Sequence, residues 1–174
     1  MTAPNDRPCP LERRLTPGEI DLVRSVFGFA IDCAPVTLRQ RRWWPLQPRK
    51  IVMAPDGHLW FAPGSPWWSA DFSAERMALQ ALLIHEMTHV WQHQQGINLI
   101  LRRFIWARYT YDNLGSGKAF TDYGIEQQAE IMRHYFLVLH GWTAPGSQPL
   151  ETYRHVVPFE PWHASRHHPR PQIG

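Results

Sequence analysis

The chain has 174 residues, of which 44% are hydrophobic, and this size and composition predict one globular domain with a substantial core. Its formal net charge is only +3 and its 18 basic residues are scattered along the chain, so we expect no nucleic-acid partner. No uncharged apolar run approaches the roughly 20 residues of a membrane span, and no apolar signal segment stands at the N-terminus, so we expect a protein made in the cytoplasm without a membrane span.

The first third of the chain predicts a helix followed by a small sheet. Residues 1–14 are expected to form an N-terminal arm. Residues 16–19, Thr-Pro-Gly-Glu, are a capping box with proline at the first helical position, and the helix they begin should end near Gly28. A strand is expected over residues 36–38. Residues 51–61 hold two apolar runs on either side of Pro-Asp-Gly, which predicts a β-hairpin.

Two tryptophan pairs, Trp43–Trp44 and Trp67–Trp68, bracket the predicted hairpin. They can fill the core of a small sheet, or they can form an aromatic rim for a substrate or a partner protein. The sequence favours the first interpretation, because a sheet of this size needs large side chains to cover it.

An HExxH motif lies in the next predicted helix, for which Ser73 is a candidate N-cap and Gly96 a candidate terminator. His85 and His89 are four residues apart, so they project from one face and can bind one metal ion. Glu86 points about 100° around the helix, where a carboxylate can reach a metal-activated water without binding the metal. This pattern is typical of a zinc hydrolase with Glu86 as the catalytic base. The core-facing stripe is expected to be Leu79, Leu83, Met87 and Val90.

A second helix is predicted over residues 123–140, with Asp122 as its cap. Residues 98–120 would join the two helices through a mixed stretch with a flexible Gly-Ser-Gly-Lys piece. The single domain is therefore expected over residues 15–162, and the segment 163–174, rich in histidine, proline and arginine, should be a disordered tail.

The second helix supplies the third ligand that a catalytic zinc site needs. Glu126 and Glu130 are four residues apart and share one face. We assign Glu126 as the ligand and Glu130 as the acid that accepts a hydrogen bond from a ligand histidine. The opposite assignment is geometrically possible, and so is a plain surface pairing of Glu130 with Arg133 or His134.

Three further residues are candidate contacts to the transition state. Tyr123 lies one helical turn before Glu126 and His134 two turns beyond it, although either can also be plain packing. His93 can border the cleft, or it can cap the helix end or face water. The oxyanion donor stays open among five residues, which are Tyr109, Tyr111, Tyr123, His93 and His134.

An HExxH motif followed by ExxxE on a later helix resembles the gluzincin group of zinc metallopeptidases. The resemblance implies a Zn²⁺ ion bound by His85, His89 and Glu126, with Glu130 supporting a histidine and Glu86 as the general base. It also implies an α+β, zincin-like fold, in which a small β-sheet packs on the HExxH helix and its edge strand can pair with an extended substrate.

A narrower resemblance is to small bacterial Vgr-related proteins and to a zincin domain found near polymorphic toxins and type VI secretion genes. It rests on four segments, residues 15–20, 23–28, 85–94 and 125–130. This resemblance implies secretion-system proteins as partners, and export by a machine that reads no cleaved signal.

Two functions are therefore in play. The leading one is a zinc-dependent peptidase that hydrolyses amide bonds of a peptide or protein substrate by means of a metal-activated water. The alternative is a non-catalytic, secretion-associated interaction module in which a structural zinc braces two helices. Glu86 separates them, because a structural brace has no use for a carboxylate at that position.

Overall fold

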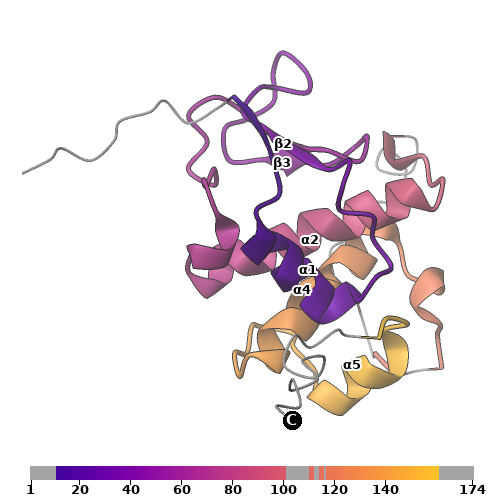
Figure 1. Ribbon diagram of the computed structural model, residues 1–174. Coiled ribbons are helices and arrows are strands. Elements are labelled where there is room, and N and C mark those ends of the chain that lie inside the picture. Colours follow the sequence, from indigo (N-terminus) through magenta and orange to yellow (C-terminus); the bar gives the residue numbers. More distant parts are fainter. Residues whose placement is uncertain (1–10, 101–109, 112–113, 116, 161–174) are drawn as a thin grey trace, which may run out of the picture.

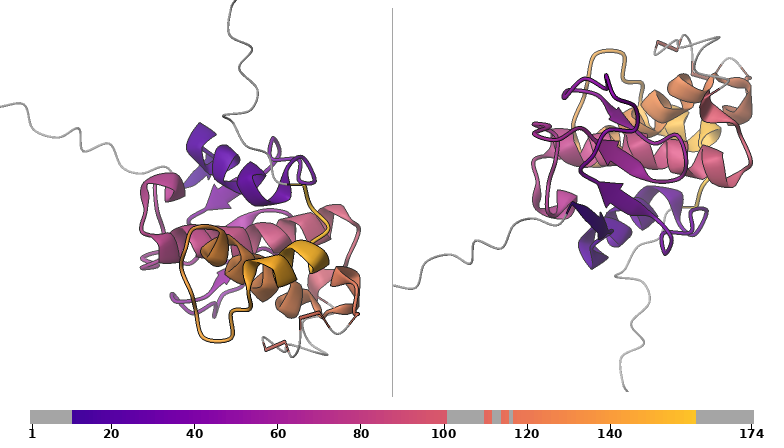
Figure 2. Two further views of the ribbon diagram at one scale, coloured as in Figure 1. Left: turned by 90° about the horizontal axis from the view of Figure 1, so that it is seen from below. Right: turned by 90° about the horizontal axis from the view of Figure 1, so that it is seen from above.

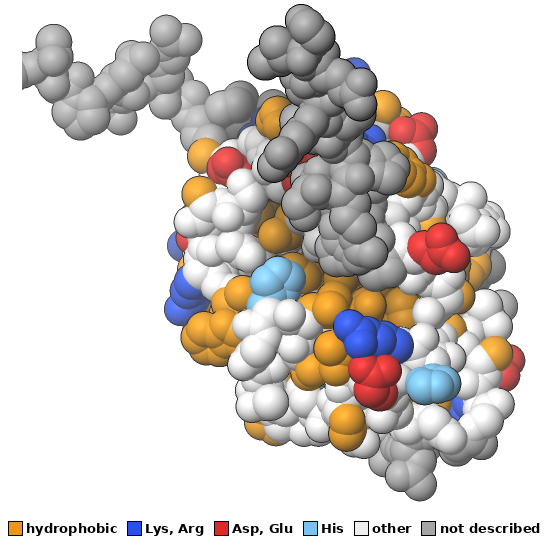
Figure 3. Space-filling model, turned by 60° about the horizontal axis from the view of Figure 1, so that its bottom comes forward, with side chains coloured by type: hydrophobic (Ala, Val, Ile, Leu, Met, Phe, Trp, Pro, Cys, Tyr) orange, Lys and Arg blue, Asp and Glu red, His pale blue; other side chains and the backbone are white. Residues whose placement is uncertain are grey.

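The computed structural model describes residues 11–100, 110–111, 114–115 and 117–160, and it shows the expected α+β architecture (Figure 1). Tyr109 and the predicted tail over 163–174 lie outside these residues. None of the described helices has both the length and the apolar character required to cross a membrane. The face shown in Figure 3 is mixed, with hydrophobic side chains gathered across its middle and charged ones scattered around them.

Within the described residues, the sheet has four strands in the order β1-β2-β4-β3. The strands are β1 (Glu12–Arg14), β2 (Thr37–Arg39), β3 (Val52–Met53) and β4 (Leu59–Phe61). β1 and β3 pair antiparallel with β2 and β4, and the two central strands run parallel. The predicted strand and hairpin are confirmed. Glu12–Arg14, assigned from sequence to the N-terminal arm, instead form an edge strand of the sheet.

One helix lies between β1 and β2, and the other described helices follow the last strand. The helices are α1 (Pro17–Phe27), the 3-10 helix η1 (Phe72–Ala74), α2 (Met77–Gln94), the 3-10 helix η2 (Phe120–Asp122), α4 (Ile125–Leu139) and α5 (Leu150–Val156). The capping box of α1 is confirmed, with Thr16 and Glu19 exchanging both hydrogen bonds. α5 was not predicted from sequence. It is only seven residues long and is held by Tyr153, whose side chain is fully buried.

Both predicted caps of the metal-site helices were wrong, for the same physical reason. Ser73 does not begin α2, because it lies inside η1, where its backbone amide and its hydroxyl both donate to Asp71, the N-cap of η1. Asp122 does not begin α4, because it accepts a hydrogen bond from the Ala119 amide and closes η2. In each case a short 3-10 turn takes the capping side chain, and the α-helix starts a few residues later.

α2 lies at the centre of the molecule. The sheet covers one side of it, and α1 and α4 flank it on two others (Figure 2). The expected core-facing residues Leu79, Leu83, Met87 and Val90 are all buried, but burial is not confined to this stripe, since every residue from 83 to 92 is buried. Five of these buried residues are polar, namely His85, Glu86, Thr88, His89 and Gln92. Because a polar group in the interior is costly without a partner, each one requires a specific explanation.

Candidate metal centre

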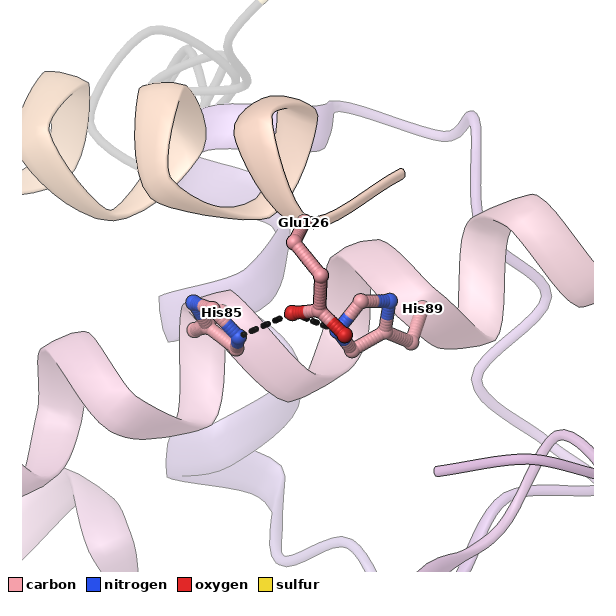
Figure 4. A group of neighbouring side chains, drawn as sticks. All are labelled: His85, His89 and Glu126. Carbon is pink, nitrogen blue, oxygen red and sulfur yellow. Dashed lines mark ion pairs between the residues drawn. The ribbon is translucent and has the colours of Figure 1, made fainter. Parts of the chain in front are cut away.

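Three side chains from two helices converge in the interior. His85 and His89 come from successive turns of α2, and Glu126 comes from the first turn of α4 and reaches between them (Figure 4). Glu126 Oε2 lies 3.5 Å from His85 Nε2 and 3.3 Å from His89 Nε2. Their exposed fractions are 8%, 3% and 1% for His85, His89 and Glu126. The sequence left open which glutamate faces the histidines, and the geometry assigns that place to Glu126.

The spacing of these three atoms suits a tetrahedral cation. Two ligand atoms that each lie about 2.1 Å from a tetrahedral zinc ion are about 3.4 Å apart. The two separations between the Glu126 oxygen and the histidine nitrogens, 3.5 Å and 3.3 Å, bracket that value. All three donor atoms lie within 4.8 Å of one another, so the group could hold a metal ion. Two imidazoles and one carboxylate are a donor set that zinc accepts.

The charges around His85 favour a cation at this point. Burial alone would lower the pKa of His85, but hydrogen bonds to Glu126 and Glu130 and the negative charge of Glu86 reverse that effect and raise the pKa to about 9. A site that holds a proton so strongly on a buried imidazole also offers a favourable potential to a metal ion. The proton and the metal would compete for the same nitrogen.

Glu130 lies behind His85. Its Oε1 is 3.0 Å from His85 Nδ1, so His85 faces a carboxylate with each of its ring nitrogens. Burial would raise the pKa of Glu130, but the hydrogen bond to His85 and the positive charges of His85, Arg133 and His134 together outweigh it, and the pKa is lowered. Arg133 lies 3.3 Å from the same carboxylate, so the surface pairing considered from sequence is also present. Such a carboxylate orients a ligand histidine and raises its basicity.

His89 is held by a residue that the sequence analysis missed, Gln92. Its amide nitrogen donates to the Ile125 carbonyl at 2.9 Å and to Gln128 Oε1 at 2.8 Å. Gln128 in turn donates to the Tyr123 carbonyl. Because both amide hydrogens of Gln92 are used, its oxygen faces His89 Nδ1, at 2.8 Å, and must accept the proton there. The lone pair of His89 is thereby placed on Nε2, the atom that faces Glu126.

Glu86 is buried beside the ligands, with 5% of its surface exposed. Its Oε2 makes no hydrogen bond to any of the described residues. A buried carboxylate oxygen without a donor is costly in a folded protein unless something else contacts it. None of the described residues therefore donates to this oxygen, which belongs to the residue next to the ligand His85 on α2.

The three candidate transition-state contacts lie in different places. Tyr123 is buried, and its hydroxyl has no hydrogen-bond partner among the described residues. His134 hydrogen-bonds the Tyr111 hydroxyl and lies 3.7 Å from Glu130 Oε2, which puts it behind the metal ligands. His93 is exposed, and its ring lies over Gly57 in the β3–β4 turn. Its role as a cleft contact stays a prediction.

A cavity of about 630 Å³ adjoins the metal ligands. It is lined by Trp43, Trp44, Met53, Ala54, Pro55, His89, Leu99, Ile100, Ile125 and Glu126. Trp43 and Trp44 are 36% and 42% exposed, so the core-filling interpretation is wrong for this pair. Trp67 and Trp68 do pack against the core, and Trp68 meets Phe61 edge-on. The core-filling interpretation is therefore confirmed for this second pair.

Comparisons with known proteins add two findings. The type VI secretion system spike protein VgrG2b of Pseudomonas aeruginosa is 46% identical over 133 residues, a match that covers 72% of this chain and 13% of the spike protein. The solved effector domain of Pseudomonas aeruginosa VgrG2b matches with a TM-score of 0.70 and 41% identity, over 83% of each chain. No family model matches the chain. The similarity therefore concerns the effector domain and only a small part of the whole spike protein.

Proposed function

This chain belongs to the family of the VgrG2b effector domain, and from that premise we propose that it is a zinc peptidase of the gluzincin type, with a zincin-like arrangement of its sheet over the HExxH helix. His85, His89 and Glu126 hold the metal, and Glu130 orients His85. The single observation that carries the proposal is the placement of a buried carboxylate, Glu86, directly beside a preformed set of three ligands.

The residues of the chain divide the chemistry among them. When bound, zinc supplies a Lewis acid that lowers the pKa of a water toward neutrality and polarises the scissile carbonyl. Glu86 accepts the proton as the water oxygen attacks the carbonyl carbon, and it later returns that proton to the leaving amine nitrogen. Gln92 keeps His89 in the tautomer whose Nε2 can bind a cation. No covalent bond to the protein forms in this scheme.

The alternative, a non-catalytic module braced by zinc, has one observation in its favour. The ligand set and the hydrogen bonds of Gln92 both join α2 to the N-terminal turn of α4, where a metal ion would fasten the two helices. A brace does not account for Glu86, however, because this residue adds buried negative charge without linking the helices.

The Glu86→Gln variant tests the proposal. We expect it to bind zinc with the stoichiometry of the wild type and to lose at least about a hundredfold in peptide hydrolysis, since a general base contributes about 10²–10⁴ in rate. Metal content is measured by mass spectrometry and hydrolysis with a mixed peptide library, with and without chelator. Glu151→Gln, which alters an exposed carboxylate on α5, is the matched control. Equal hydrolysis by both variants would overturn the peptidase proposal and leave the brace.

Delivery by a type VI secretion machine is part of the proposal, because the similar VgrG2b of Pseudomonas aeruginosa is a spike protein of that system. The chain would then act outside the cell that makes it, with secretion-system proteins as partners. We expect a tagged form to reach the culture medium from cells with a working type VI apparatus, and to stay in cells whose apparatus is inactivated. Release that is equal in the two strains contradicts this part.

A further inference from the structure

The cavity beside the metal ligands has a markedly apolar lining. His89 and Glu126 form one side of it, and the remaining lining residues are tryptophans, methionine, proline, alanine and aliphatic side chains. Its volume, about 630 Å³, is within the range of about 300–1,000 Å³ that is usual for ligand pockets. Because two metal ligands line it, any group that fills the cavity lies next to the reacting bond.

The aromatic wall of this cavity is held in place by a buried glutamine. Gln47 is 1% exposed, and its amide nitrogen donates to the carbonyls of Ile51 and Trp60 at 2.8 Å and 3.1 Å. Its side-chain oxygen accepts a hydrogen bond from the Trp43 backbone at 2.8 Å. A single side chain therefore fixes both ends of the loop that presents Trp43 and Trp44. A buried amide with all its partners satisfied makes this loop a specific structure.

The ring of Trp43 is also supported from behind. It meets the ring of Trp60 edge-on, at 5.1 Å between centroids. Trp60 is itself buried, with the guanidinium groups of Arg39 and Arg41 within 5 Å of its ring centroid and a hydrogen bond from its indole nitrogen to Asp56. The wall is thus ordered before any ligand arrives, so binding does not have to order it.

Trp43 and Trp44 nevertheless keep more than a third of their surface exposed. Water-exposed aromatic surface in a preformed concave site is typical of a recognition surface, since an apolar ligand gains by covering it. The core pair Trp67–Trp68 provides the contrast, because those rings pack against the core of the domain.

We propose that Trp43 and Trp44 are specificity-determining residues, which select peptide substrates with a large apolar side chain next to the scissile bond. The proposal rests on the proposed peptidase function and names its substrate class. The occupant is a side chain of the substrate, because the cavity is continuous with His89 and Glu126, the residues that would hold the metal against the substrate carbonyl. Gln47 is a positioning residue for this wall.

Binding is measured separately from hydrolysis. The zinc-loaded Glu86→Gln protein is titrated with acetyl-phenylalanine amide, acetyl-alanine amide and decanoate, and affinities are read by NMR. We expect the phenylalanine ligand to bind at least about tenfold more tightly than the alanine ligand, as is usual when a pocket fits a larger apolar group. Adding Trp44→Ala should remove most of this preference and Trp44→Phe should restore it. Trp142→Ala, which removes an exposed tryptophan outside the cavity, should leave it unchanged.

Each outcome decides between the two claims. Equal binding of the two amides, or a preference that survives Trp44→Ala, overturns the proposal that the tryptophans select a large apolar side chain. Tighter binding of decanoate than of the phenylalanine ligand assigns the cavity to a lipid chain, and this result also overturns the proposal of a substrate side chain in the cavity. If the wild type cleaves no peptide while the variants still discriminate, the peptidase proposal fails and the pocket stands. Cleavage beside apolar residues by the wild type, lost in Trp44→Ala, supports both.

Discussion

Replacing Gln92 with leucine should damage the metal site without touching a ligand. The substitution keeps approximately the same volume but removes one acceptor and two donors from the interior. Two buried groups then lose their partner, namely His89 Nδ1 and Gln128 Oε1, and the Ile125 carbonyl in the first turn of α4 loses its side-chain donor. Each unsatisfied group costs about 1–3 kcal/mol. Relaxation and the apolar gain of leucine offset part of that, so we expect a loss of about 3 kcal/mol in unfolding free energy.

The metal affinity should fall as well. Without Gln92, nothing fixes the proton of His89 on Nδ1, and a proton on Nε2 would face Glu126 and the cation. Loss of such an orienting partner costs about 10–100-fold in metal affinity. Affinity is measured by competition with a chromophoric chelator, and stability by urea unfolding of the metal-free protein.

Gln94→Leu is the matched control for this experiment. Gln94 lies two residues further along α2, and its side chain hydrogen-bonds the backbone of Asp32 at the surface. Both of its bonds can be replaced by water, so we expect a loss below about 1 kcal/mol and unchanged metal affinity. A folded Gln92→Leu protein that binds zinc as tightly as Gln94→Leu would refute the tautomer argument.

Two further predictions concern charge. The raised pKa of His85 stabilises the metal-free fold, fully so at a pH below about 6.5, the ordinary pKa of histidine, and this contribution is lost as the pH rises through about 9. Zinc affinity should instead increase by about tenfold per pH unit until His85 has lost its proton. Thermal unfolding with and without zinc over pH 6–10 measures both effects. Glu19 is fully buried and binds Arg13 through both oxygens, so Glu19→Gln should cost about 3–5 kcal/mol in urea unfolding, against less than about 1 kcal/mol for Glu151→Gln at the exposed pair with Arg154. A flat pH profile, or similar losses for the two pairs, contradicts the respective argument.

The ligand set could be predicted from sequence because its spacing is local. His85 and His89 are four residues apart on one helix, and a helix fixes the direction of both side chains whatever packs around it. The same rule identified Glu126 and Glu130 as sharing one face. The structure adds only which side of His85 each glutamate faces, which depends on how α4 lies across α2.

Gln92 could not be found in this way. In the sequence it opens the run Gln-His-Gln-Gln, whose composition indicates a solvated helix end. Its neighbours His93 and Gln94 are indeed exposed, and only the packing of α4 on that turn buries Gln92. The Trp43–Trp44 pair was misjudged for a similar reason, because the long-range bonds of Gln47 decide which way the loop faces.

The interior polar groups of α2 separate the two candidate functions. Thr88 donates to the carbonyl one turn before it, and Gln92 uses its whole amide. His85 and His89 each face a partner on both ring nitrogens. His85 Nδ1 and His89 Nε2 lack a hydrogen bond but each lies within 3.3 Å of a carboxylate oxygen, whereas Glu86 Oε2 has neither a hydrogen bond nor an ion pair among the described residues. A helix that pairs its other buried polar side chains, and keeps an unpaired carboxylate oxygen on the residue next to the ligand His85, is better explained by a need for a base there than by a need for a brace.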